Sequence, residues 1–560
     1  MRHYLWVVLL LCSAFLGPQN AAAETLHFIN GYAADPASRQ ATDDYKTLGD
    51  ASDGWQRYQD YANGYAVAVP AGMNLDISLS AVRTVFQTPA HKIEIYRDDL
   101  RHTGSTISEY MEYGNRFLQN TKDHELLQDS YTTDAAGRLV HILQWQRRSL
   151  KAVPQDRNHY YCAEIATGGS EVYTILIKST EPIDWGDAVR RSFQRISREG
   201  NAGIFRRDNS TAKTFSHQEL QAFWQRYFSP SSTWTWGIFE PSAPEVLRPL
   251  NAIEESTKHK FPFLLRYQTL EERAPIRGLQ QAYEEGRYVE LTLSTIRTSD
   301  EANALWTGGS SNASFVYEVL DGQHDEYFRL HARQLKYFNH PVLLRLNNEM
   351  NGDWCWYSAY HLSKDADLYI ALWNHLRRLY AEEGADNVLW VWNPHDVSRP
   401  DFGWNHSYVY YPGDDAVDIV GMTGYNNGTY FPAEKWRTFQ EIYQPLYQGY
   451  STAFPGKPFL IGEFSSNSVG GDKPAWIRDM FSHLKEYPNI KVAIWWSGID
   501  YDQNGQPGRI YILDEDEPTL QAFREGAAKQ NPPKPVPAPA QPPAATQPEK
   551  QKKQTLTTSI

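Results

Sequence analysis

The stretch PVLLRLNNEMNGDW, residues 341–354, decides the fold of the larger part of this chain. Its first half is a short apolar run that predicts a buried strand, and a carboxylate, Glu349, stands where that strand ends. In a parallel α/β barrel the catalytic groups stand at the carboxyl ends of the strands. The stretch therefore predicts a barrel strand with chemistry at its end.

Seven other segments have the same strand-like character and alternate with helical segments such as 325–338, 365–382 and 476–486. With residues 342–346, the eight predicted strands are 234–239, 262–267, 288–294, 342–346, 388–392, 419–423, 459–462 and 492–496. Strands that alternate with helices are typical of βαβ units. We therefore expect a (β/α)8 TIM barrel over residues 219–530, an α/β fold that typically needs about 250 residues before insertions.

The region before the barrel, residues 24–199, mixes short strands with helices and predicts a smaller α+β accessory domain. Its expected strands include 64–70, 91–96, 139–145 and 171–177, and a helix is expected at 183–196. The layout weakly resembles PsbP/Mog1-type domains in pattern, and no motif in it carries chemistry. Two further segments are expected to lack a core: a polar linker at 200–218 and a disordered Pro-rich tail at 531–560.

Residues 1–23 have the pattern of a secretory signal peptide. Arg2 precedes an apolar run from Leu5 to about Gly17, and Ala21-Ala22-Ala23 follows as a small-residue cleavage site. The run is shorter than the roughly 20 residues of a membrane-spanning helix, so no transmembrane segment is expected. We expect a secreted or cell-envelope protein, extracellular or periplasmic.

The composition narrows the choice of partner. The formal net charge is −13 and the pI is about 5.7, which argues against nucleic acid or an anionic membrane surface. A neutral polysaccharide is indifferent to that charge. The 18 Trp and 35 Tyr residues suit stacking on sugars as well as they suit a large core. We expect a monomer that acts on polysaccharide, and association with cell wall or exopolysaccharide stays open.

A second carboxylate, Glu463, ends the predicted strand in KPFLIGEF, residues 457–464. A barrel brings the ends of distant strands to one face, so Glu349 and Glu463 are expected to meet. Retaining hydrolysis of a glycosidic bond needs one carboxyl group as acid and another, about 5–5.5 Å away, as nucleophile. Arg345 points to the same side as Glu349 and can keep a neighbouring carboxylate charged.

Residues 320–500 resemble the catalytic domain of family 26 glycoside hydrolases, which are mostly β-mannanases of the retaining barrel clan. The resemblance rests on several motifs in order: Asp321-Gly322 with Asp325, then RLNNEMNGDW at 345–354, YPGD at 411–414, VDIVGMTGYN at 417–426 and IGEF at 461–464. It implies an O-glycosyl hydrolase of the endo-β-mannanase type, and no cofactor is expected. Histidines such as His361, His395 and His406 show no ligand spacing, so no catalytic metal is expected.

The resemblance also implies roles for single residues. Glu349 would be the general acid/base and Glu463 the nucleophile, with Tyr425 hydrogen-bonded to the nucleophile. Trp354 and one of Trp495 and Trp496 would form platforms for sugar rings. Alternation along a strand puts only one of the two adjacent tryptophans toward the cleft, and the sequence does not say which.

One departure from the family pattern concerns the residue before the acid/base. The mannanases commonly have histidine there, whereas this chain has Asn348, which is usual in the wider clan and contacts the hydroxyl beside the anomeric carbon. The departure leaves other β-glycans, or an exopolysaccharide, open as substrates. A second hypothesis is a non-catalytic polysaccharide-binding or cell-surface scaffold protein that kept the barrel. Asp500 to Gly505 opens like a calcium loop but lacks the final glutamate, which favours a simple turn.

Overall fold

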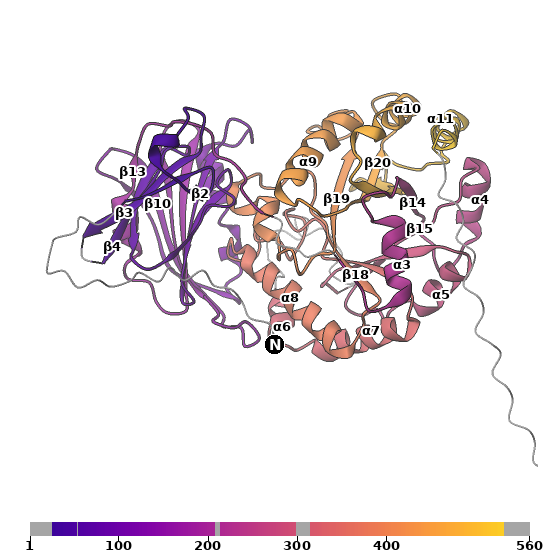
Figure 1. Cartoon of the computed structure of the whole chain (residues 1–560), viewed down its shortest axis with the longest axis horizontal. Helices are drawn as coiled ribbons and strands as arrows, with labels where there is room; N and C mark the ends of the chain where they lie inside the picture. The colour runs from indigo at the N-terminus through magenta and orange to yellow at the C-terminus, as the bar shows by residue number, and fades with distance from the viewer. Residues whose placement is uncertain (1–24, 53, 208–212, 298–313, 531–560) are drawn as a thin grey trace, which may run out of the picture.

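The computed structural model describes residues 25–52, 54–207, 213–297 and 314–530. Figure 1 shows two bodies side by side: a β-rich accessory domain built from the described residues between 25 and about 200, and a ring of strands and helices built from the described residues after them. The predicted signal peptide at 1–23 and the predicted tail at 531–560 lie outside the described residues.

Eight parallel strands close into a barrel in chain order, so the predicted TIM barrel is confirmed. The strands are β14 (Thr235–Phe239), β15 (Phe263–Gln268), β16 (Tyr288–Leu293), β17 (Val342–Leu346), β18 (Val388–Trp392), β19 (Ile419–Asn426), β20 (Phe459–Ser466) and β21 (Ile490–Trp496). The largest difference from the predicted bounds lies at the carboxyl ends of β19 and β20. Polar residues extend both strands there, toward the face where chemistry is expected.

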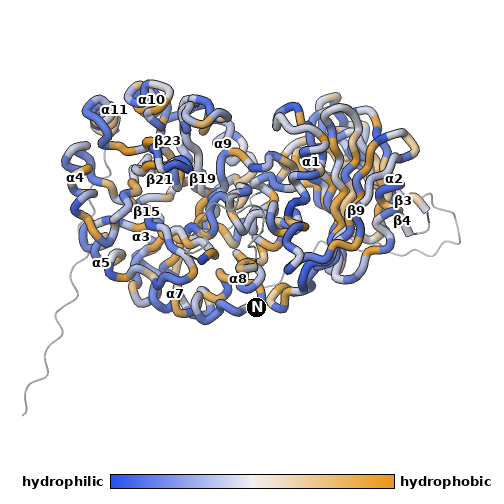
Figure 2. Tube along the Cα trace, turned by 180° about the vertical axis from the view of Figure 1, so that it is seen from behind, coloured by the Kyte–Doolittle hydropathy of each residue, from blue (hydrophilic) through white to orange (hydrophobic). Residues whose placement is uncertain are grey.

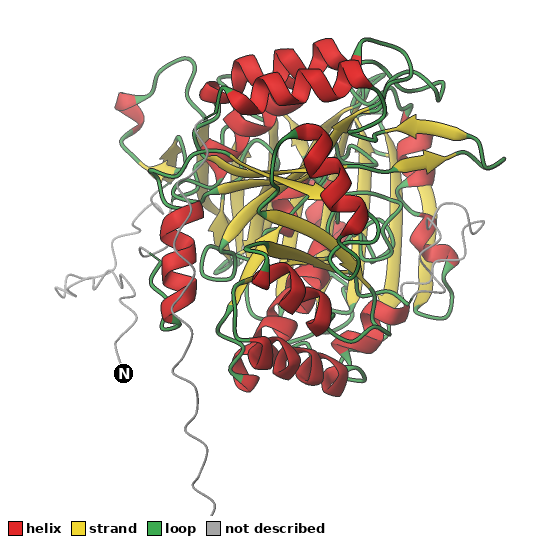
Figure 3. Ribbon diagram, turned by 90° about the vertical axis from the view of Figure 1, so that its right-hand side faces the viewer, coloured by secondary structure: helices red, strands yellow, loops and turns green. Residues whose placement is uncertain are grey.

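The helices of the barrel lie outside the strands (Figure 3) and bury one apolar face each. They are α4 (Arg248–Thr257), α5 (Ile276–Glu284), α6 (Ser314–Leu320), α7 (Asp325–Phe338), α8 (Ala366–Glu383), α9 (Phe439–Ala453), α10 (Lys473–His483) and α11 (Glu517–Ala528). The β17–α8 connection is long, and it lies at the carboxyl end of the barrel.

Helix α3 (Gln218–Tyr227) packs against side chains that fill the barrel interior. Its aromatic residues Phe223 and Tyr227 contact Phe263 of β15 and Tyr288 of β16, near the amino ends of those strands. Inward leucine, valine and isoleucine side chains from the other strands complete this cluster. The barrel is therefore a packed core below its carboxyl face.

The accessory domain consists of two antiparallel sheets that share one apolar core. The six-stranded sheet has the order β13 (Gln194–Arg195), β5 (Tyr65–Pro70), β4 (Trp55–Asp60), β3 (Tyr45–Ser52), β1 (Leu26–Ile29) and β2 (Tyr32–Ala33). The seven-stranded sheet has the order β6 (Asn74–Asp76), β7 (Arg83–Gln87), β8 (His91–Asp99), β12 (Glu171–Ser179), β11 (His159–Ala166), β10 (Leu139–Arg147) and β9 (His124–Thr133). Figure 2 shows the apolar runs along these strands.

Helical structure in the accessory domain is limited to short segments, among them α1 (Ile107–Tyr113) and α2 (Gly186–Ser192). The predicted helix at 183–196 is therefore too long. After α2, Phe193 has an extended backbone and packs on Tyr65 and Tyr173 in the core between the sheets. The next two residues form β13, so tertiary packing overrides the helical spacing of the apolar residues.

Cys162 and Cys355 are free thiols. In the part of the chain that the structure describes, no helix combines the length and apolar character that crossing a bilayer requires.

Candidate active site

Glu349 follows β17 and has a left-handed backbone conformation, with φ of 57°. Such a conformation is costly for a residue other than glycine and is common at functional sites. Two backbone hydrogen bonds hold it, because the Glu349 amide donates to the Asn393 carbonyl at 2.7 Å and Gly352 donates to the Glu349 carbonyl at 2.8 Å. The end of the strand is also fixed by Asn347, which exchanges hydrogen bonds with Thr295. The backbone therefore fixes where the Glu349 side chain begins.

Glu463 extends from β20 and accepts three hydrogen bonds. Arg345 Nη2 lies 2.5 Å from Oε1 and Asn348 Nδ2 lies 3.4 Å from the same oxygen, while the Tyr425 hydroxyl donates to Oε2 at 2.7 Å. These donors come from β17, the residues just after it, and β19. Both carboxylate oxygens are thus oriented, and residues that flank Glu349 in sequence contact Glu463 in space.

The environment of Glu349 differs from that of Glu463. Burial raises the pKa of the Glu349 carboxyl above its ordinary value, and the negative charge of Glu463 adds to the rise. His395, the Trp354 hydrogen bond and Arg345 oppose it. A carboxyl group whose pKa is raised, beside an oriented carboxylate, is the arrangement that acid-assisted displacement requires.

A buried chain of charges runs beneath the two glutamates. Arg345 Nε lies 2.7 Å from Glu290 of β16 and 2.8 Å from Thr292 Oγ1, while its Nη2 binds Glu463. Burial raises the pKa of Glu290 to about 7. Gly462 makes room for this chain, since a Cβ there would lie 2.7 Å from Arg345 Nη1 and 2.4 Å from Asn393 Oδ1.

The structure separates the candidate tryptophans. Trp496 packs on Phe239 and Tyr425 inside the barrel, and its Nε1 donates to the Tyr267 hydroxyl at 3.0 Å. Trp495 is fully buried under the outer helices, where it contacts Phe464, Trp476 and Phe523. Trp495 therefore cannot serve as a sugar platform, and its place among the candidates is wrong.

Trp354 lies beside Glu349, and its role is more specific than a platform. Its Nε1 donates to Glu349 Oε2 at 2.9 Å, and its ring meets His395 edge to face at 5.0 Å. The indole is partly exposed. It can offer a ring face to a sugar while it orients the carboxyl group.

Sequence reasoning missed three residues of this site: Glu290, Tyr267 and His395. Each stands on or just after a barrel strand, and each is polar in a segment that otherwise reads as core. Tyr267 lies next to Arg345 and accepts the Trp496 hydrogen bond. His395 lacks the spacing of a metal ligand, but its position just after β18, at the carboxyl end of a barrel strand, could have marked it as a site residue.

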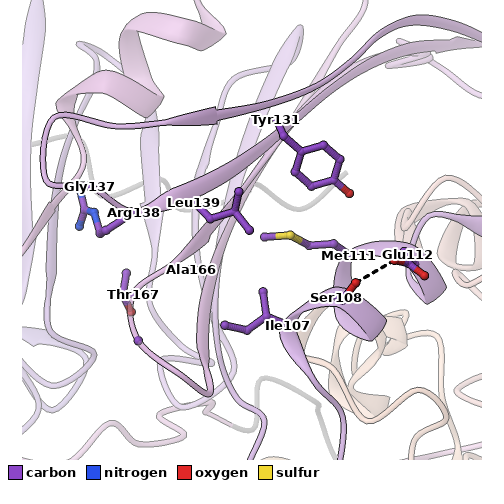
Figure 4. A pocket seen from close by; sticks show the side chains of 11 residues that line it. Ile107, Ser108, Met111, Glu112, Tyr131, Gly137, Arg138, Leu139, Ala166 and Thr167 are labelled. Atoms are coloured by element: carbon purple, nitrogen blue, oxygen red, sulfur yellow. Dashed lines mark hydrogen bonds between the residues drawn. The ribbon is translucent and has the colours of Figure 1, made fainter.

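A separate open cavity of about 760 Å³ lies on the accessory domain (Figure 4). It is bounded by α1, the β9–β10 hairpin and the β11–β12 turn, and its apolar lining includes Ile107, Met111 and Leu139. Its one lining carboxylate, Glu112, accepts a hydrogen bond from Ser108. This cavity therefore lacks the carboxylate pair that the barrel face presents.

The calcium-like stretch forms a hairpin of β22 (Ile499–Tyr501) and β23 (Pro507–Ile510). Asp502 accepts the amides of Asn504 and Gln506, and Asp500 pairs with Arg509. Its carboxylates are thus bound within the turn. Among the described residues, no group of three or more His, Cys, Asp or Glu side chains is arranged to hold a metal ion.

Residues 293–451 match the profile of glycosyl hydrolase family 26. The matched range includes Glu349 and Tyr425 but ends before Glu463. The inclusion of Glu463 in the candidate site therefore rests on its hydrogen bonds with Arg345, Asn348 and Tyr425.

Two curated relatives illustrate the similarity. The chain is 32% identical over 196 residues to a mannan endo-1,4-beta-mannosidase of Bacillus subtilis, covering 32% of this chain and 48% of that protein. It is 31% identical over 222 residues to endoglucanase H of Acetivibrio thermocellus, covering 38% of this chain and 23% of that protein. The chain therefore spans less than half the length of these relatives.

Among solved structures, a GH26 beta-mannanase from Bacteroides ovatus aligns over 56% of this chain and 91% of its own. The identity of that pair is 16% and the TM-score is 0.41.

Proposed function

We propose that the barrel, of which residues 293–451 match the profile of glycosyl hydrolase family 26, hydrolyses internal β-1,4 bonds of mannan or a related β-linked polysaccharide by double displacement. The observation that supports this most is the pair of strand-end glutamates in contrasting environments. Glu463 is oriented by three donors, whereas burial raises the pKa of Glu349.

In the first step Glu463 attacks the anomeric carbon and the bond to the leaving sugar oxygen breaks. Glu349 gives its proton to that oxygen, so the leaving sugar departs neutral and a covalent glycosyl-enzyme forms. In the second step Glu349, now a carboxylate, takes a proton from water, and the water oxygen displaces Glu463. The product keeps its β configuration and both carboxyl groups return to their starting states.

The remaining residues hold this geometry. Arg345 and Tyr425 bind the two oxygens of Glu463 and leave its charge directed at the anomeric centre. Trp496 contacts Tyr425 and Trp354 contacts Glu349, and both side chains are partly exposed, which suits stacking against sugar rings. The Asn348 amide contacts Glu463 Oε1, and we expect it to bind the hydroxyl next to the anomeric carbon.

The test is product analysis on a panel of β-glycans that includes mannan, glucomannan, mixed-linkage glucan and xylan. We expect mannan to give short oligosaccharides of mixed length, as internal cleavage does. Glu463→Ala should lower turnover by several orders of magnitude, whereas Glu284→Ala, an exposed carboxylate of α5, should not. Polymer retention without new reducing ends would indicate a binding protein and contradict the proposal.

Azide separates the two roles. In Glu349→Ala, azide can replace water in the second step and give a β-glycosyl azide. In Glu463→Ala, azide can attack the substrate directly and give the α product. The reverse pattern would exchange the assignments.

We also propose that the chain is exported to the cell envelope or beyond and that cleavage follows Ala23. The support is the signal-like pattern of residues 1–23. The mass of the protein recovered from the producing cell tests this, since the mature chain should begin at Glu24.

A further inference from the structure

The accessory domain contacts the segment that carries Glu349. Residues 347–365 connect β17 to α8, and several of their side chains bind partners from the accessory domain rather than from the barrel. The partners come from α1, β9, β11 and β12.

The contact nearest to the site joins Tyr113 of α1 to Asp353. The Tyr113 hydroxyl donates to Asp353 Oδ2 at 2.6 Å, and the Tyr113 ring packs 4.9 Å from Tyr360. The Asp353 side chain is buried, and burial raises its pKa, which the Tyr113 hydrogen bond opposes. His361 donates to the Asp353 carbonyl at 2.7 Å. Asp353 is therefore held at both its side chain and its backbone.

A second set of contacts holds the far end of the connection. Lys364 pairs with Glu164 of β11 at 2.5 Å, and both side chains are fully buried. Asp365 accepts hydrogen bonds from Tyr160 and Lys178, each within 2.8 Å. Lys364 itself has a left-handed backbone with φ of 56°, a conformation that needs such support.

Trp354 connects the Tyr113–Asp353 contact to Glu349, the proposed acid/base. Trp354 directly follows Asp353 in sequence, and its indole donates to Glu349 Oε2. A shift of Asp353 thus moves the group that orients the Glu349 carboxyl. Helix α1 and the barrel site are joined by three consecutive links: Tyr113 to Asp353, Asp353 to Trp354, and Trp354 to Glu349.

We propose that Tyr113 is a positioning residue for the acid/base, so that the accessory domain forms a fixed part of the active site. This rests on the proposed function in assigning Glu349 its role. It contrasts with a detachable module that only binds polymer, because such a module would have no need of buried contacts to the segment after the catalytic strand.

The test compares two variants of the full chain that undergo the same chemical change. Tyr113→Phe removes the hydroxyl that binds Asp353. Tyr161→Phe removes a hydroxyl that faces Asp187 within the accessory domain and serves as the control.

The first measurement is hydrogen exchange of residues 352–361, in which the amides of Gly352, Cys355, Ser358 and His361 form turn hydrogen bonds. Tyr113→Phe should speed exchange there about tenfold, because a buried carboxylate loses a short hydrogen bond. Tyr161→Phe should leave it unchanged. Equal exchange in both variants would overturn the inference, and this result does not depend on any turnover.

The second measurement compares kcat/KM on two substrates. With mannan, whose leaving oxygen needs a proton, Tyr113→Phe should lower kcat/KM by about tenfold to a hundredfold. With 2,4-dinitrophenyl β-mannobioside, whose leaving group departs without a proton, the loss should stay within about twofold. An equal loss on both substrates would show a general structural defect and contradict positioning of the acid.

The two proposals can fail separately. If the unaltered chain cleaves neither substrate while Tyr113→Phe still speeds exchange at 352–361, the hydrolase proposal fails and the fixation of this segment by Tyr113 stands. If the chain is an active mannanase and exchange does not change, only the role of Tyr113 is lost.

Discussion

Arg345 Nη2 lies 2.5 Å from Glu463 Oε1, and Arg345 Nε lies 2.7 Å from Glu290, so one buried guanidinium joins strands β16, β17 and β20 beneath the site. The planar group contacts the two carboxylates through separate nitrogens: Nη2 donates to Glu463, while Nε donates to Thr292 and lies within ion-pair distance of Glu290. A lysine side chain has one nitrogen in place of these two.

Arg345→Lys should therefore lower kcat on the best polysaccharide by at least about tenfold, because lysine cannot place nitrogens at both the Nε and the Nη2 positions that orient Glu463 relative to Thr292 and Glu290. Steady-state kinetics measures this. The control is Arg287→Lys, since Arg287 is a buried guanidinium that pairs with Glu254 and Glu285, away from the site. Equal kcat losses in both variants would mean that the effect is not specific to Glu463.

Trp354→Phe should move the alkaline limb of the kcat/KM profile to higher pH. The indole N–H stabilises the ionised form of Glu349, so its loss raises the pKa of the acid further. The expected shift is about half a unit to one unit. The control is Trp495→Phe, in which the lost indole bond goes to the Tyr511 carbonyl. An unmoved or acid-shifted limb in Trp354→Phe would contradict the assignment.

Glu290→Gln should flatten the dependence of stability on pH. The ordinary pKa of a glutamate is 4.5, and burial raises that of Glu290 to about 7. Between these values only the unfolded chain releases the proton, so stability falls as pH rises and stops falling above about 7. The fall is about 3 kcal/mol at most.

Urea unfolding of the glutamine variant at several pH values measures the difference. The variant should lack this component of the fall between about pH 4.5 and 7, whereas Glu284→Gln, at an exposed site, should keep it. Identical slopes in Glu290→Gln and the unaltered chain would show that the carboxyl does not titrate there.

Lys178→Met should destabilise the contact between the two domains. Lys178 is buried and pairs with Glu94, Asp365 and Asp367, each at 3.0 Å or less. Removing one partner of a buried ion pair costs about 3–5 kcal/mol, because the remaining charges stay buried.

Chemical denaturation followed by fluorescence measures this loss. Arg191→Met is the control, since its pair with Asp187 is exposed and contributes about 1 kcal/mol or less. Comparable stability of both variants would show that the buried acids find other compensation.

The barrel strands could be predicted closely from the sequence because parallel strands are buried on both faces and read as short apolar runs. The residues 342–346 and 388–392 match β17 and β18 at both ends. The carboxylate after β17 could be found for the same reason, since a charged residue at the end of such a run stands out.

Other features depended on contacts that sequence does not display. The choice between Trp495 and Trp496 depends on strand rotation, which alternation alone leaves undecided. Glu290 lies within a predicted strand, and only the presence of Arg345 on the next strand explains it. The length of α2 depended on Phe193 turning into the core between two sheets.

The buried contacts between the domains also bear on how this protein can be handled in the laboratory. A barrel produced by itself from α3 onward would leave Asp353, Lys364 and Asp365 without their partners from the other domain. Protein engineers who wish to shorten the chain should therefore first replace these side chains with neutral ones. Those who wish to graft the barrel onto another carrier should keep residues 24–207 with it.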